Sequence, residues 1–268
     1  MFNRRSFLTK TGSAAAMASA ASLAGSSPAG ADDKSPAKTP YIEVVTLRAH
    51  FGEQSDRLMA WLEKRAMPIF KRHIEGPIGV FSVDVGPHIP SAVIITSYPS
   101  LAVYERESDN LYADPEWLAA TGEAEASGPP FFRLDSTLLH ALPFSPPLKA
   151  AAPGDPAYKL FELRTYESST YRQIEMMHQR FHPQEIEAFA KCGINPIFYA
   201  DTYVGPNQPN MVYMIPFESE AHREKAWAAF RAHPDWKSIA AEWMKKSGEL
   251  ARNIYNSILV PTSYSMIR

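Results

Sequence analysis

The sequence predicts an α+β fold built from two fused repeats, each with the element order β-α-β-β-α-β. The first observation is that strand-like runs rich in β-branched residues alternate with segments of helical hydrophobic period. The second is a repeated order of motifs. With an offset of 119 residues, positions 85–87 (Val-Gly-Pro) match 204–206, and Pro115 and Trp117 match Pro234 and Trp236. One duplicated unit explains both observations.

The first repeat spans 41–142 and follows a polar lead-in at 32–40. Its predicted strands are 41–48, 80–85, 92–98 and 131–142, and its predicted helices are 54–73, 101–108 and one that begins at 114–117. Ser100 can cap the second helix, and Pro68 should kink or divide the first.

A segment rich in proline and alanine, 143–157, predicts a linker to the second repeat at 158–268. Thr170 with Gln173 suggests a capping box, Ser219 a second cap, and Cys192-Gly193 a helix end. The predicted strands are 158–166, 197–204, 211–217 and 254–260, and the predicted helices are 170–191, 219–230 and 234–246.

Each repeat follows the ferredoxin-like plan, a four-stranded antiparallel sheet with helices on one face. Such a sheet leaves its other face bare. Two sheets in one chain can cover these faces by closing into a single barrel with the helices outside. Further homo-oligomers remain possible.

The first 31 residues predict an export signal. Arg4-Arg5 within Asn3–Lys10 is typical of a twin-arginine leader, an Ala-rich run follows, and cleavage is expected after Ala31. We therefore expect the twin-arginine export machinery as a partner and a periplasmic or otherwise extracytoplasmic protein. A disordered Ala-rich tail is the alternative.

Composition narrows the classes of function. Without the leader the chain has 24 basic and 29 acidic residues, a net charge of about −5, which argues against nucleic-acid binding. No apolar run reaches the ~20 residues needed to span a membrane. Cys192 is the only cysteine, so an intramolecular disulfide is excluded, and we expect an inert thiol.

The second repeat resembles the NIPSNAP domain in Glu162–Tyr166, in the Gly205–Asn207 loop, in Phe217–Ser219 and in Pro234–Trp236. In the first repeat the resemblance is weaker, and an offset of 116 places Arg48 where Arg164 stands. The resemblance implies the dimeric α/β barrel superfamily, which includes small monooxygenases and haem enzymes. It implies no specific reaction.

Strand alternation puts polar side chains on one face, which we expect to point into the barrel interior. From the second repeat these candidates are Glu162, Arg164, Tyr166, Tyr199, Asp201 and Tyr213. From the first they are Thr46, Arg48, His50, Ser82, Asp84 and Thr96. They predict either a satisfied polar core or a pocket in which Arg164 holds an anionic group and the tyrosines bind a small aromatic or carboxylate-bearing molecule.

His178 and His182 are spaced four apart on a predicted helix, a spacing that could hold a metal. No third candidate ligand stands at a sequence spacing typical of metal sites. A capping or exposed role is the alternative. The leading functional hypothesis is ligand binding with oxygenase-like or isomerase-like chemistry and no cofactor. The others are a non-catalytic scaffold and a haem protein.

Overall fold

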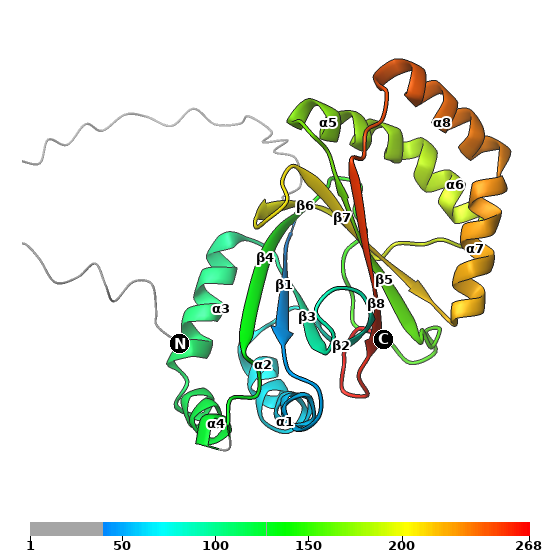
Figure 1. The fold of residues 1–268 in the computed structure, drawn as a ribbon. Helices are drawn as coiled ribbons and strands as arrows, with labels where there is room; N and C mark the ends of the chain where they lie inside the picture. Colours follow the sequence, from blue (N-terminus) through cyan, green and yellow to red (C-terminus); the bar gives the residue numbers. More distant parts are fainter. Residues whose placement is uncertain (1–39, 127) are drawn as a thin grey trace, which may run out of the picture. The chain divides into compact units, whose positions relative to one another are not determined.

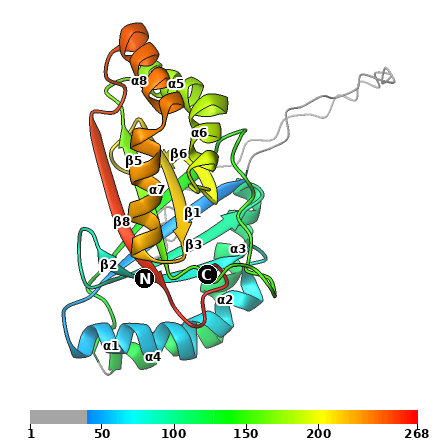
Figure 2. The ribbon, with the colours of Figure 1, turned by 90° about the vertical axis from the view of Figure 1, so that its right-hand side faces the viewer.

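The computed structural model describes residues 40–126 and 128–268, so the predicted leader and its cleavage site lie outside the described residues. Within these residues eight strands close into one antiparallel barrel in the order β1-β3-β2-β8-β5-β7-β6-β4. Each repeat supplies four adjacent strands. The helices of the two repeats cover different sides of the barrel (Figures 1 and 2). The predicted fold class is confirmed.

The elements of the two repeats follow one another in the same order. The first repeat contains β1 (Tyr41–Arg48), α1 (Glu53–Trp61), η1 (Leu62–Ala66), α2 (Met67–His73), β2 (Ile78–Val85), β3 (Ser91–Tyr98), α3 (Leu101–Ala113), α4 (Pro115–Ala126) and β4 (Arg133–Ala141). The second contains β5 (Leu160–Glu167), α5 (Tyr171–Arg180), η2 (Phe181–Glu185), α6 (Ile186–Lys191), β6 (Phe198–Val204), β7 (Asn210–Phe217), α7 (Glu220–Ala232), α8 (Pro234–Ser247) and β8 (Asn253–Pro261).

The predicted helix caps are present. Ser100, Thr170 and Ser219 each accept a hydrogen bond from the backbone N–H three residues on. The first helix changes from α to π geometry in η1, just before Pro68, which then lies in the first turn of α2, where proline is tolerated. No helix among the described residues is long and apolar enough to cross a membrane.

A single offset of 119 residues relates the two repeats through their first strands as well. Thr46 of β1 pairs with Val93, and Thr165 of β5 pairs with Val212. The predicted offset of 116 for this strand was therefore wrong, and Arg48 corresponds to Glu167 rather than to Arg164. Because side chains alternate along a strand, an error of three residues also exchanges the two faces.

Apolar side chains fill three regions. The barrel interior holds residues of both repeats, including Ile42, Phe81, Phe161 and Phe198. Each sheet also packs against its own helices. The second sheet–helix layer contains Phe181, Phe189, Trp227 and Phe230, with Trp236 against it, and the first contains Trp117. The matching tryptophans Trp117 and Trp236 thus both pack between sheet and helices.

Candidate functional site

The polar residues predicted for the second repeat lie between its sheet and its helices, not in the barrel interior. Phe161 belongs to the interior core, with Leu163 packed against it, whereas Tyr166, Tyr199 and Tyr213 pack with the helices. The predicted face was wrong. Side chains from all strands fill the interior of an eight-stranded barrel, which favours apolar residues there, while the helices bring polar partners to the outer face.

For the first repeat, the predicted strand faces are wrong only in part. Thr46 and Arg48 do share a strand face with Ile42 of the interior core. Ser82 and Thr96 share a face with Val80 and Ile94, which pack on the helices. Asp84 is exposed at a bulge in the pairing of β2 with β8, and His50 lies beyond the end of β1. The interior therefore does not receive the polar set that we expected.

Glu162 is the centre of the polar layer in the second repeat. Its side chain is 0% exposed. Oε2 accepts hydrogen bonds from Nε of Arg223 and from Nε1 of Trp227, both at 2.8 Å, and Oε1 accepts one from Asn256 at 3.2 Å and one from Arg164. Burial opposes the charge, but these partners together hold the pKa of Glu162 below its ordinary value.

Each nitrogen of the Arg164 guanidinium donates to a group of the protein itself. Nη1 donates to Glu162, Nε donates to the Tyr213 hydroxyl at 3.0 Å, and Nη2 donates to the Tyr166 hydroxyl at 3.1 Å. Its guanidinium also lies 4.6 Å from the ring centroid of Trp227. These contacts make Glu162 and Arg164 a satisfied buried pair. Their role in binding a ligand stays a prediction.

The first repeat does not repeat the arginine and tyrosines of this layer. At the positions of Arg164, Tyr166, Tyr199 and Tyr213, an offset of 119 places apolar residues that pack on the first repeat's helices. These residues are Val45, Leu47, Val80 and Ile94. Only the glutamate is kept, as Glu43. The two repeats thus share a fold but differ in the hydrogen-bonding groups of this layer, since Glu43 accepts from Tyr104 and Ser136 rather than from arginine and tryptophan.

A second polar group lies beside this network, around the ring of Phe144. His178 of α5 and Asp201 of β6 are joined by a contact of 2.9 Å between Nε2 and Oδ1. Phe144 stacks on His182 at 5.0 Å and meets the edges of His178 and Tyr199 at 6.5 and 5.5 Å. The side chains of His178 and Asp201 are 19% and 33% exposed, so this group is open to solvent.

The two histidines do not form the metal site that their spacing suggested. The backbone of His182 is extended (φ −108°, ψ 123°), so the two do not share one regular helical face. No group of three or more His, Cys, Asp and Glu residues that could hold a metal is present in residues 40–126 and 128–268. Cys192, at the end of α6, is half-buried, and burial raises the pKa of its thiol, which makes it less reactive.

The hydroxyl group of Tyr199 makes no hydrogen bond within the described residues. The side chain of Tyr199 is 2% exposed. Burial, and then the nearby carboxylate of Glu185, raise the pKa of Tyr199. Glu185 is itself buried and paired with Arg180 at 2.8 Å. A buried hydroxyl without a protein partner is costly, so Tyr199 can bond a group from outside the protein.

Replacing Tyr199 with phenylalanine should stabilise the ligand-free protein. The substitution removes only the unpartnered hydroxyl, which costs about 1–3 kcal/mol of desolvation. Urea unfolding would measure the gain in free energy of unfolding. Tyr213→Phe is the matched control, because the Tyr213 hydroxyl accepts a hydrogen bond from Arg164, and it should destabilise the protein. A loss of stability in Tyr199→Phe would contradict this account.

Arg48, the candidate from the first repeat, lies apart from these groups. Its Nε is 2.6 Å from Oδ2 of Asp135, and its Nη1 is 3.2 Å from Nδ1 of His88 in the β2–β3 loop. The structure therefore does not bring Arg48 together with Arg164.

Sequence reasoning missed the partners that come from helices and from the linker. Arg223 and Trp227 are spaced four apart on α7, so they share a helix face, and both reach Glu162. That spacing was visible in the sequence once Glu162 was placed on the helix side. Phe144 lies in the predicted linker, where nothing in the sequence indicated packing against Tyr199.

Comparisons with known proteins agree on the family and the fold. The family model described as NIPSNAP matches residues 43–146 and 161–266. A candidate monooxygenase from Lactobacillus acidophilus NCFM has a similar structure over 84% of this chain and 94% of its own, with TM-score 0.54 and 14% identity. An anthrone oxidase-like protein matches over 84% of this chain and 92% of its own, with TM-score 0.52 and 13% identity.

Single NIPSNAP-family proteins cover a smaller share of this chain. One from Agrobacterium tumefaciens str. C58 covers 41% of this chain and 94% of its own, with 24% identity and TM-score 0.37. Among curated proteins, none matches the sequence. At these identities the neighbours establish the fold alone.

Proposed function

Because the chain belongs to the NIPSNAP family and carries two copies of its domain, we propose that the second copy binds a small aromatic molecule between its sheet and its helices and removes a proton from it. The observation that carries the proposal is the His178–Asp201 pair, because the ring of Phe144 contacts both His178 and Tyr199, whose hydroxyl has no partner among the described residues. A fold shared with a candidate monooxygenase and an anthrone oxidase-like protein supports a small-molecule site.

In this proposal His178 is the general base. Its Nε2 donates to the carboxylate of Asp201, which fixes the tautomer and leaves Nδ1 to accept a proton. Tyr199 donates its hydroxyl hydrogen to an oxygen of the ligand. His182 supplies a ring against which a planar ligand stacks.

The carbanion or enolate that results has two productive fates. In an isomerase-like reaction the proton returns at a different carbon. In an oxygenase-like reaction the electron pair passes to O₂, one oxygen atom stays in the product as a carbonyl, and the other leaves as water. The proposal assigns no cofactor to either reaction.

Phe144 occupies the place of an aromatic ligand, because its ring already stacks on His182 and contacts Tyr199. Ligand binding then requires this ring to move. We therefore expect Phe144→Ala to bind anthrone, the compound in one neighbour's name, more tightly than the unmodified protein does. Isothermal titration measures the change. Phe132→Ala is the matched control, since Phe132 stacks on His50 in the same way at 4.5 Å in the first repeat.

A gain in affinity for Phe144→Ala but not for Phe132→Ala would support the site. If neither variant nor the unmodified protein binds anthrone, native mass spectrometry of protein from its own source can still identify a bound organic molecule or haem. The proposal is contradicted if native mass spectrometry shows a ligand-free protein and if Phe144→Ala binds anthrone no more tightly than the unmodified protein does.

The second candidate is a non-catalytic scaffold or assembly module. It is favoured by one observation, that the protein's own groups already bond both oxygens of Glu162 and all three nitrogens of Arg164. Under this alternative the His178–Asp201 pair only stabilises the packing of α5 against β6. Substituting His178 would then alter stability without altering any reaction.

We also propose export by the twin-arginine route, supported by Arg4-Arg5 and the following Ala-rich run. The expected result is cleavage after Ala31, which leaves Asp32 as the N-terminal residue. The denatured mass of protein isolated from the periplasm measures this directly. Replacing both arginines with lysine should leave the uncut chain in the cytoplasm, and secretion of that variant would contradict the proposed route.

A further inference from the structure

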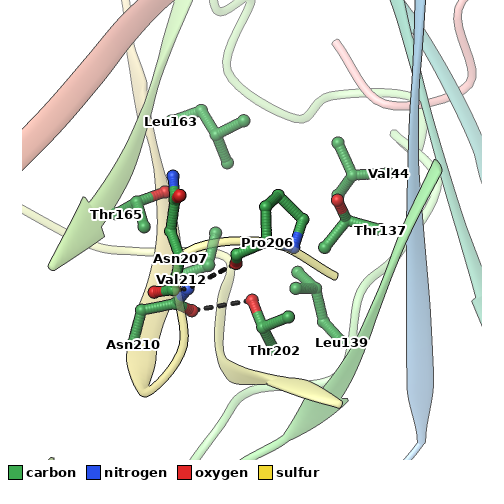
Figure 3. Close-up of a pocket in the computed structure, with 10 residues that line it drawn as sticks. All are labelled: Val44, Thr137, Leu139, Leu163, Thr165, Thr202, Pro206, Asn207, Asn210 and Val212. Carbon is green, nitrogen blue, oxygen red and sulfur yellow. Dashed lines mark hydrogen bonds between the residues drawn. The ribbon is translucent and has the colours of Figure 1, made fainter. Parts of the chain in front are cut away.

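A small cavity lies inside the barrel, on the opposite face of the sheet from His178 and Asp201. Its volume is about 120 Å³. It is lined by Val44, Thr137, Leu139, Leu163, Thr165, Thr202, Pro206, Asn207, Asn210 and Val212. Figure 3 shows Leu163 and Thr165 on one side, Val44 and Thr137 on the other, and the β6–β7 loop with Pro206 between them.

The lining combines apolar walls with unused hydroxyl groups. No residue of the lining carries a charge, and four are aliphatic. The hydroxyls of Thr137 and Thr165 have no hydrogen-bond partner among the described residues, and neither hydroxyl is sealed from solvent. A charged ligand would lose its hydration here without gaining a counter-charge, so the lining favours a neutral molecule.

The loop over the cavity is held in place from within. Asn210 is 3% exposed, and its Oδ1 accepts a hydrogen bond from Thr202 at 2.7 Å. Its Nδ2 donates to the backbone oxygens of Pro206 at 3.2 Å and of Asn207 at 2.7 Å. Asn207 adopts the left-handed backbone conformation, which asparagine tolerates (φ 62°). The cavity is therefore pre-formed rather than dependent on loop closure.

The equivalent place in the first repeat has different chemistry. There His88 stands at the position of Asn207, Val83 at that of Thr202, and Arg48 with Asp135 forms an ion pair. The amide of Asn207 and the hydroxyl of Thr202 are thus specific to the second repeat.

We propose that this cavity binds a small neutral molecule with a hydroxyl or carbonyl group. The hydroxyls of Thr137 and Thr165 would bond the polar group, and the aliphatic side chains would enclose its carbon atoms. The volume is well below the ~300–1,000 Å³ of pockets for drug-sized ligands, so the molecule has only a few non-hydrogen atoms.

Fluorine NMR titration of the intact protein tests the proposal with two matched probes. Trifluoroethanol is neutral and has a hydroxyl, whereas trifluoroacetate is of similar size and charged. We expect saturable binding of trifluoroethanol only. Thr165→Val and Thr137→Val should each weaken it about tenfold, because each removes one hydrogen bond without changing volume. Thr46→Val, the same change at the position equivalent to Thr165, should leave binding unchanged.

Circular dichroism of each variant establishes that it is folded, and two independent threonine variants keep the test intact if one fails to fold. The proposal is overturned if trifluoroethanol does not bind, if trifluoroacetate binds equally well, or if both threonine variants bind like the unmodified protein. A Thr46→Val effect as large as that of Thr165→Val would also overturn it.

Discussion

Replacing Glu162 with glutamine is expected to destabilise the protein by about 3–5 kcal/mol, the cost of breaking a buried ion pair by removing one partner. Glu162 is completely buried and is the carboxylate shared by Arg164 and Arg223. Glutamine keeps the shape but leaves Arg164 without its paired carboxylate and Arg223 with Glu220 alone. Urea unfolding at neutral pH measures the loss of free energy of unfolding.

Glu43→Gln is the control, because Glu43 occupies the equivalent strand position and has neutral partners. Ser136 donates to its carboxylate at 2.7 Å and Tyr104 at 3.2 Å. Burial raises the pKa of Glu43, and these two hydrogen bonds only partly oppose it. An amide can accept the same bonds, so the variant should be at least as stable as the unmodified protein at pH 7.

The two glutamates should also affect stability in opposite directions along the pH scale. The folded-state pKa of Glu162 is lowered, so its contribution is fully present above the ordinary value of 4.5 and is lost as the pH falls through the folded pKa. The folded-state pKa of Glu43 is raised, so its contribution is present below 4.5 and is lost as the pH rises through the folded pKa. The penalty of Glu162→Gln should therefore shrink in acid.

Equal effects of the two substitutions would contradict this assignment. So would a loss below about 1 kcal/mol for Glu162→Gln, the scale of an ordinary hydrogen bond. Either result would mean that the charges of Arg164 and Arg223 are balanced by groups other than Glu162.

The fold could be predicted because its signals are local and duplicated. Strand and helix periods, the caps at Ser100 and Ser219, and the matching loops at 85–87 and 204–206 each specify an element without knowledge of the partner repeat. A constant offset then implies two copies of one plan, and two half-open sheets close most simply on each other.

The site could not be predicted in the same way, because strand alternation separates the two faces but does not say which one is inside. Glu162 and Phe161 are equally compatible with either side until their partners are known. The deciding contacts come from Trp227 and Arg223, more than 60 residues along the chain. The three-residue error in the offset at Arg48 reinforced the wrong choice, since it matched an interior residue with a residue on the helix side.

His178→Gln should slow proton removal from the ligand by about 10²–10⁴-fold, the range for loss of a general base. Anthrone provides the probe, because exchange of its acidic methylene hydrogens in D₂O without oxygen reports proton removal alone. Glutamine can still donate to Asp201, and His178 is partly exposed, so stability should change little. Asp201→Asn should slow exchange less, since it affects the base only through its orientation.

The first repeat offers a matched control in His73, whose Nε2 lies 2.6 Å from Oδ2 of Asp114. Asp114 also accepts a hydrogen bond from the backbone of Glu116 at the start of α4, so this His–Asp pair braces a helix end. His73→Gln should therefore lower stability and leave exchange unchanged. If His73→Gln and His178→Gln affect exchange equally, the result contradicts the assignment of His178 as the general base. A specific effect of His178→Gln requires what the second repeat adds, namely Tyr199 and His182, which contact the same Phe144 ring as His178 does.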